Sequence, residues 1–215
     1  MTVRVAILGA GGFARELRWA VDHGRTPSGE TLQTVAFVEL AARTELLKGL
    51  PVVSLDELDD DTSLVCGLGG MTEIKTRVIM DALSRGHRFA PPLIAAGAIV
   101  GPDVVLGSGS VVCAGAVVTA DVTIGEHVAI HVTCAIGHDA TIGDFATVSP
   151  GACVSGWVAV GRGAFLGTGS AVIEKVSIGQ DSVLGAGAVA IRDVPARAVA
   201  VGVPAVVIKT DRFAD

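Results

Sequence analysis

From residue 94 onward, aliphatic residues recur at every sixth position. Sixteen consecutive members of this series, from Ile94 to Leu184, are all Val, Ile or Leu. A second series, four positions later, runs from Ala98 to Ala188 and contains only Ala, Val, Ser or Cys. Neither the period of an α-helix nor the alternation of a plain β-strand produces such columns. The pattern therefore predicts a six-residue repeat, in which each unit buries one large and one small side chain.

An eighteen-residue period is superimposed on the hexads. An aliphatic residue followed by glycine recurs at Leu106-Gly107, Ile124-Gly125, Ile142-Gly143, Val160-Gly161 and Ile178-Gly179. Three hexads then form one triangular coil with three short strands and three corners, and successive coils stack at the parallel-strand spacing of roughly 4.8 Å. We therefore predict a parallel β-helix in which residues eighteen positions apart lie above one another.

The N-terminal part has another pattern. Residues 1–93 hold 22 of the 38 charged residues and lack the hexad. Buried strands are predicted at Val3–Leu8, Thr34–Val38 and Ser63–Cys66, and helices after the first of these and at Thr72–Ser84. These elements indicate a small Rossmann-like β-α-β domain. We expect an α/β domain over residues 1–92, a β-helix over residues 93–205 and a C-terminal tail over residues 206–215.

Composition excludes several classes of protein. Half of the residues are hydrophobic and 18% are charged, which excludes a disordered chain. The net charge of −6 argues against nucleic-acid binding. No apolar stretch is long enough for a membrane span. The four cysteines lack the paired spacing of a zinc site, so reduced thiols in a cytoplasmic protein are expected.

Both halves together resemble the bacterial hexapeptide-repeat sugar acetyltransferases. The closest resemblance is to the sialic-acid O-acetyltransferase family, which includes N-acetyltransferases of nucleotide-linked amino-sugars. It rests on the segments Gly9–Gly12, Ile136–Phe145 and Val201–Ala205. The resemblance implies a left-handed β-helix, acetyl-CoA as co-substrate, and a homotrimer that binds acetyl-CoA between neighbouring β-helices. It also implies a role in polysaccharide biosynthesis.

The catalytic base of that family falls on His138, and a supporting acid falls on Asp139. Acetyl transfer needs a neutral amine or an activated hydroxyl, and an imidazole can accept the proton near neutral pH. The neighbours eighteen positions away, Ala120 and Gly156, would leave open space beside His138. Because consecutive strand residues point to opposite faces, both residues act together only if the chain turns here or the acid acts through water or a neighbouring subunit. Otherwise they are polar residues on an edge of the β-helix.

The glycine loop Gly9–Ala14 fits the dinucleotide pattern G-x-G-x-x-A. The front domain is too short for a second mononucleotide half, so a single nucleotide is expected in place of NAD. The resemblance implies that the nucleotide-sugar contacts Gly11, Gly12, Phe13, Glu39, Leu40, Gly67 and His131. Tight strand-to-helix turns also use glycine for purely structural reasons.

The resemblance places acetyl-CoA near Thr147, Thr168 and Ala186. A histidine often found near acetyl-CoA in the family aligns with Thr147, so this contact is missing or replaced. His127 and His131 have the His-x3-His spacing of some helical zinc sites, but this segment is predicted to be β-helical. No metal is expected, and His127 is expected at the surface.

The sequence therefore predicts an acetyl-CoA-dependent N-acetyltransferase acting on the amine of a nucleotide-linked amino-sugar, with His138 as general base. Two alternatives stay open. One is an O-acetyltransferase of a sugar hydroxyl, of the sialic-acid type. The other is a non-catalytic β-helical binding module.

Overall fold

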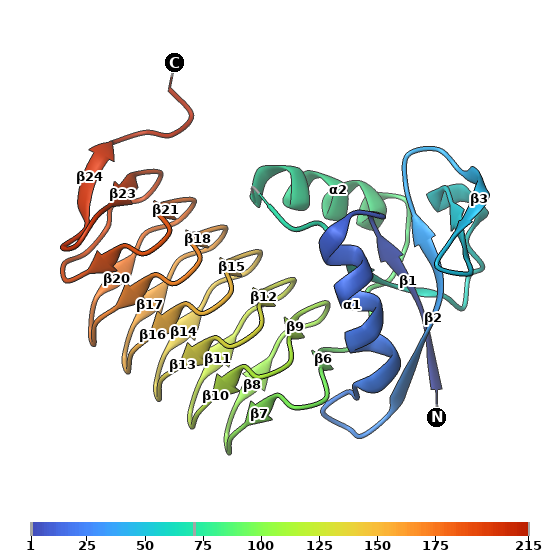
Figure 1. Cartoon of the computed structure of the whole chain (residues 1–215), viewed down its shortest axis with the longest axis horizontal. Helices are drawn as coiled ribbons and strands as arrows, with labels where there is room; N and C mark the ends of the chain where they lie inside the picture. Colours follow the sequence, from blue (N-terminus) through green and yellow to red (C-terminus); the bar gives the residue numbers. More distant parts are fainter. Residues whose placement is uncertain (1, 71, 215) are drawn as a thin grey trace.

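The structure is a computed structural model that describes residues 2–70 and 72–214. Residues 1 and 215, which the expected boundaries include, lie outside these ranges. A small α/β part precedes a left-handed parallel β-helix, as predicted (Figure 1). Within the described ranges, the helices are all too short or too polar to cross a membrane.

The α/β part is built on one five-stranded sheet in the order β3-β4-β2-β1-β5. Its elements are β1 (Thr2–Leu8), α1 (Gly12–His23), β2 (Thr31–Val38), β3 (Arg43–Leu47), β4 (Leu50–Val53), a 3-10 turn (Leu55–Glu57), β5 (Ser63–Cys66) and α2 (Thr72–Ser84). β1 runs parallel to both β2 and β5. The three predicted strands and both helices are confirmed.

The β3–β4 hairpin was not predicted. Its two-residue turn is Lys48-Gly49, and both residues have positive φ, at 52° and 80°. This geometry suits the twist of a hairpin but is usually marked by Asn-Gly or Asp-Gly. The sequence of β3, three polar residues followed by two leucines, also lacks a strand-like alternation, so this edge of the sheet has little local sequence signal.

The β-helix consists of two-residue strands at six-residue intervals, stacked in three parallel sheets. These are β6 (Leu93–Ile94), β7 (Ile99–Val100), β8 (Val105–Leu106), β9 (Val111–Val112), β10 (Val117–Val118), β11 (Thr123–Ile124), β12 (Ala129–Ile130), β13 (Ala135–Ile136), β14 (Thr141–Ile142), β15 (Thr147–Val148), β16 (Cys153–Val154), β17 (Ala159–Val160), β18 (Phe165–Leu166), β19 (Ala171–Val172), β20 (Ser177–Ile178), β21 (Val183–Leu184) and β22 (Val189–Ala190). β23 (Val199–Val201) and the antiparallel β24 (Val206–Lys209) close the last coil. Paired residues are eighteen apart, as in Val100, Val118 and Ile136.

The predicted columns fill the interior of the prism. The second residue of nearly every strand is buried, and the small residues of the second series pack beside them. Glycine follows the aliphatic residue because the coils approach closely there. A Cβ added at Gly161 would lie 2.5 Å from the backbone nitrogen of Gln180 on the next coil. Close stacking therefore explains the eighteen-residue aliphatic-glycine pairs.

Each corner contains one residue with positive φ, again at six-residue intervals. We name the corners by these residues: corner A at 115, 133, 151, 169 and 187; corner B at 103, 121, 139, 157 and 175; corner C at 109, 127, 145, 163 and 181. Glycine, Asp and Asn adopt this left-handed conformation at least cost. Each face of the prism is named by its two corners: β13 belongs to face AB, β14 to face BC, and β12 and β15 to face CA.

The α/β part covers face CA. Leu17 and Val21 of α1 share a core with Leu93, Val111 and Cys113 of the β-helix. Figure 1 shows α1 beside β6 and β9, with α2 above the next coils.

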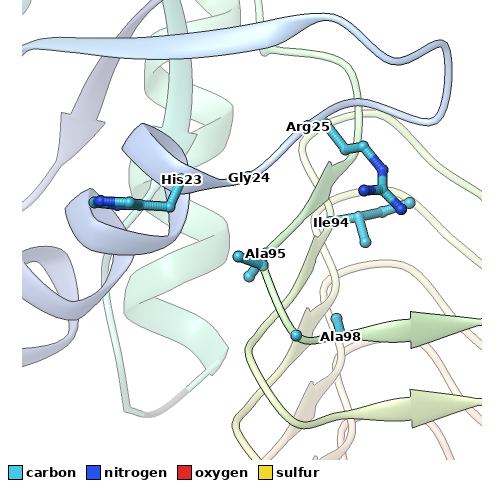
Figure 2. A pocket seen from close by; sticks show the side chains of 8 residues that line it. His23, Gly24, Arg25, Ile94, Ala95 and Ala98 are labelled. Atoms are coloured by element: carbon cyan, nitrogen blue, oxygen red, sulfur yellow. The ribbon is translucent and has the colours of Figure 1, made fainter.

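At the base of this junction, backbone hydrogen bonds join Arg25 and Ile94 in both directions, at 3.0 and 2.8 Å. A cavity of about 270 Å³ lies here, lined by residues 23–25 and 94–98 (Figure 2). Figure 2 shows the imidazole of His23 turned away from Ala95 and Ala98. The cavity contains none of the predicted site residues.

Candidate active site

His138 and Asp139 form a hydrogen-bonded pair at corner B. They lie in the turn between β13 and β14, and Asp139 has a φ of 58°. This left-handed residue turns the chain, so the two side chains do not point to opposite faces. Nδ1 of His138 lies 2.8 Å from Oδ2 of Asp139. Because a carboxylate only accepts, Nδ1 donates, and in the neutral form of the ring Nε2 carries the lone pair.

The imidazole of His138 is open to solvent but closely bounded by protein. Its side chain is 52% exposed. A Cβ at Gly156, on the next coil, would lie 2.7 Å from Cε1 of His138, so a side chain there would displace the ring from this position. The indole of Trp157 meets the imidazole edge-on, with ring centroids 4.5 Å apart. Sequence reasoning missed Trp157, although it lies eighteen positions after Asp139.

A second group of predicted residues lies where the α/β sheet meets the β-helix. Gly11 and Gly12 are exposed at the start of α1. The ring of Phe13 lies 4.4 Å from that of His131 on face CA. Burial, and then the nearby charge of Lys75, lower the pKa of His131 to about 4. At neutral pH this side chain is therefore an uncharged hydrogen-bonding group.

The other predicted nucleotide contacts follow the carboxyl ends of β2 and β5, the two parallel strands that flank β1. Glu39 and Leu40 follow β2, and the side chain of Leu40 is fully exposed. Gly67 follows β5 but is buried, and a Cβ there would lie 2.5 Å from Ile7 and 2.8 Å from Ala14. Its absence of a side chain thus serves the packing of α1 against the sheet. Ligands of open α/β sheets bind at this strand edge.

Thr147, on face CA, is buried beneath α2 and bonded to a lysine that sequence reasoning also missed. Nζ of Lys75 donates to Oγ1 of Thr147 at 2.8 Å and to the carbonyl oxygen of Ala146 at 3.1 Å. Burial lowers the pKa of Lys75 to about 8. Its position in α2 gives no sequence signal, because the partners are more than seventy residues away.

His127 corrects one expectation: it is not a surface residue. It occupies corner C with 5% of its surface exposed, between the rings of Phe89 and Phe145 at 4.5 and 5.1 Å. The α/β part covers this corner, which could not be read from the repeat. Burial, and then Lys75, lower the pKa of His127 to about 4. Among the described residues, no cluster of three or more His, Cys, Asp or Glu side chains is suited to a metal.

Thr168 and Ala186 are exposed at corner A, on consecutive coils. His138 is at corner B, across face AB, so one chain does not bring the two sets together. Face AB presents apolar side chains along its whole length: Ile99, Val117, Ala135, Cys153, Ala171 and Val189. Face BC is more polar, with Thr123, Thr141 and Ser177 exposed.

Comparison with solved structures decides the family. A point mutant of perosamine N-acetyltransferase from Caulobacter crescentus, in complex with CoA and GDP-perosamine, is 32% identical to this chain, with a TM-score of 0.79. The match covers 94% of this chain and 95% of that one. This chain belongs to the hexapeptide-repeat sugar acetyltransferases. It is an acyltransferase.

A second member of the family supports the assignment. The acetyltransferase domain of PglB from Neisseria gonorrhoeae, in complex with acetyl coenzyme A, is 28% identical over 97% of this chain and all of that one, with a TM-score of 0.84. WeeI from Acinetobacter baumannii, at 24% identity and a TM-score of 0.83, shares the fold. No protein-family model and no curated protein matches the chain.

Proposed function

We propose that this sugar acetyltransferase transfers an acetyl group from acetyl-CoA to the amine of a nucleotide-linked amino-sugar, with His138 as general base. One observation above all supports this. An accessible imidazole is hydrogen-bonded through Nδ1 to Asp139 at 2.8 Å, so that in the neutral ring the free lone pair is on Nε2. That arrangement is the one general-base catalysis requires.

In this reaction, Nε2 of His138 accepts a proton from the acceptor amine as the amine nitrogen bonds to the thioester carbonyl carbon. The carbon–sulfur bond then breaks, and His138 returns the proton to the departing thiolate. The products are the acetamido-sugar and CoA. Asp139 stabilises the imidazolium that forms and holds the ring in place.

A neighbouring copy completes the site in this proposal. Face AB is apolar and uncovered, and corner B with His138 borders it on one side, whereas corner A with Thr168 and Ala186 borders it on the other. A cyclic homotrimer packed through these faces brings corner B of one copy to corner A of the next. Acetyl-CoA then lies between them, along Thr168 and Ala186.

Thr147 contributes differently in this account. Its hydroxyl is held by Lys75 under α2, so we assign it to anchoring α2 against face CA of the β-helix. The nucleotide binds across the strand edge at Gly11 and Gly12, with Phe13, Glu39 and Leu40 around it. Gly67 lets α1 pack against the sheet beneath this edge. The neutral His131, whose ring contacts Phe13, faces the sugar.

We place the reaction in the cytoplasm, as a step that supplies acetamido-sugars for polysaccharide biosynthesis. The four cysteines are free thiols, three of them buried, which suits a reducing compartment.

An acceptor panel tests the function. CoA release is measured with acetyl-CoA and, in turn, GDP-perosamine, a UDP-linked 4-amino-sugar, the free amino-sugar and sialic acid. We expect turnover with a nucleotide-linked amine and little with the others. Turnover of sialic acid alone would establish O-acetylation instead. Absence of turnover with every acceptor, together with no CoA binding by calorimetry, would contradict the proposed reaction and favour a non-catalytic module.

A further inference from the structure

Trp157 occupies an unusual place in the repeat. It lies at corner B one coil after Asp139, with a φ of 55° and half of its surface exposed. Positive φ is uncommon for a bulky residue, and exposed indole surface brings no hydrophobic gain. The equivalent positions on the preceding coils are Asp103, Asp121 and Asp139, whose short side chains tolerate this conformation well.

The backbone conformation does not favour a tryptophan at this position, but the contacts of the indole ring explain why one is there. Its ring is perpendicular to that of His138, with centroids 4.5 Å apart. On the next coil, Nζ of Lys175 lies 5.4 Å from the centroid of the indole, within range of a cation–π interaction. The indole of Trp157 therefore contacts Lys175 on one side and His138 on another.

The imidazole of His138 thus has three restraints. Asp139 binds Nδ1, the backbone of Gly156 lies close to the ring, and Trp157 bounds its remaining side. A half-exposed side chain with a single hydrogen bond would otherwise rotate about χ1 and χ2. A general base must keep its acceptor nitrogen within reach of the proton it removes.

We infer that Trp157 is a positioning residue for His138, an inference that rests on the proposed function. The indole fixes the orientation of the imidazole, and the rate of acetyl transfer depends on that fixed orientation. Trp157 itself need not touch the acceptor or the acetyl group.

The test compares kcat, KM and thermal unfolding for Trp157→Gly, Trp157→Phe and His138→Ala. Glycine suits a positive φ, so we expect Trp157→Gly to fold and to keep the wild-type unfolding midpoint. We expect its kcat to fall by about 10 to 100-fold, as for a misplaced catalytic group, with KM for acetyl-CoA nearly unchanged. Trp157→Phe retains an aromatic ring beside His138 and should recover most of kcat.

Asp103→Gly is the matched control. It relieves the same backbone conformation at the same corner, two coils from Asp139, and should leave kcat unchanged. A wild-type kcat in Trp157→Gly, a raised KM with unchanged kcat, or no recovery in Trp157→Phe would each overturn the inference. If His138→Ala is inactive while Trp157→Gly is fully active, this inference alone fails. Full activity in both would also overturn the assignment of His138 as base.

Discussion

At the scale of single residues, two histidines only eleven positions apart occupy opposite environments. His127 is enclosed by Phe89 and Phe145, whereas His138 is open to solvent beside Asp139. The six-residue repeat is the same around both histidines and does not distinguish them. What separates them is the α/β part, which covers corner C and leaves corner B free.

Alanine variants of these histidines should therefore have opposite effects. His127→Ala removes a buried ring, and large-to-small changes in a core cost roughly 2–5 kcal/mol. We expect a lower free energy of unfolding in urea, with kcat retained at temperatures where the variant is folded. His138→Ala should keep the stability of the wild type and lose activity. Equal stability of the two variants would contradict the buried placement of His127.

Lys75 gives a second residue-scale prediction, because burial lowers its pKa from 10.5 to about 8. Between these values the unfolded chain keeps a proton that the folded protein has released, so the free energy of unfolding rises with pH. Below about pH 8 both states bind the proton, and the slope vanishes. Lys75→Met lacks this linkage. Urea unfolding of both proteins from pH 7 to 10.5 should show the wild type gaining stability relative to the variant, and parallel curves would contradict the burial.

At the scale of elements, the coil spacing imposes different demands on different glycines. Gly161 has no room for a Cβ, since the nitrogen of Gln180 lies 2.5 Å from that position. Gly151 has a φ of 70° but an open surrounding, with one atom at 4.0 Å. Gly151→Ala should cost about 1–2 kcal/mol through its left-handed backbone. Gly161→Ala should lower the unfolding midpoint further, because neighbouring coils must separate; an equal effect in the two variants would contradict this stacking.

The elements also show how far sequence alone can reach. Strand positions, register and core of the β-helix all follow from the six- and eighteen-residue periods, because each coil repeats the same local packing. The place of His138 and Asp139 on an edge follows as well. The orientation of the Asp139 side chain could not be predicted, because an aspartate in the sequence does not by itself indicate a positive φ.

Contacts between distant segments escaped prediction for a different reason. The hydrogen bond from Lys75 to Thr147 and the ring contact between Phe13 and His131 form only because α2 and α1 cover face CA. The periodicity of the β-helix is the same on all three faces. It therefore gives no indication of which face the α/β part occupies, nor of which histidine becomes buried.

At the scale of the whole molecule, the uncovered apolar face predicts the mode of assembly. Cys153 is the one exposed cysteine among the described residues, and it lies on face AB. We expect a homotrimer by light scattering, in which Cys153 reacts slowly with a thiol reagent. Ala135→Arg places a charge in the same face and should give monomers with a reactive Cys153 and little activity. A wild-type monomer, or an unchanged trimer in Ala135→Arg, would contradict assembly through this face.

The most direct test of the account is the turnover number of His138→Ala with acetyl-CoA and the best nucleotide-linked amino-sugar. Loss of a general base typically lowers the rate by about 10² to 10⁴-fold. We expect a fall of this size in kcat, with a much smaller change in the KM of the acceptor, and nearly as large a fall in His138→Asn. Asp139→Asn should be milder. Retention of most of the wild-type kcat by His138→Ala, between about pH 6 and 9, would contradict the central role of His138.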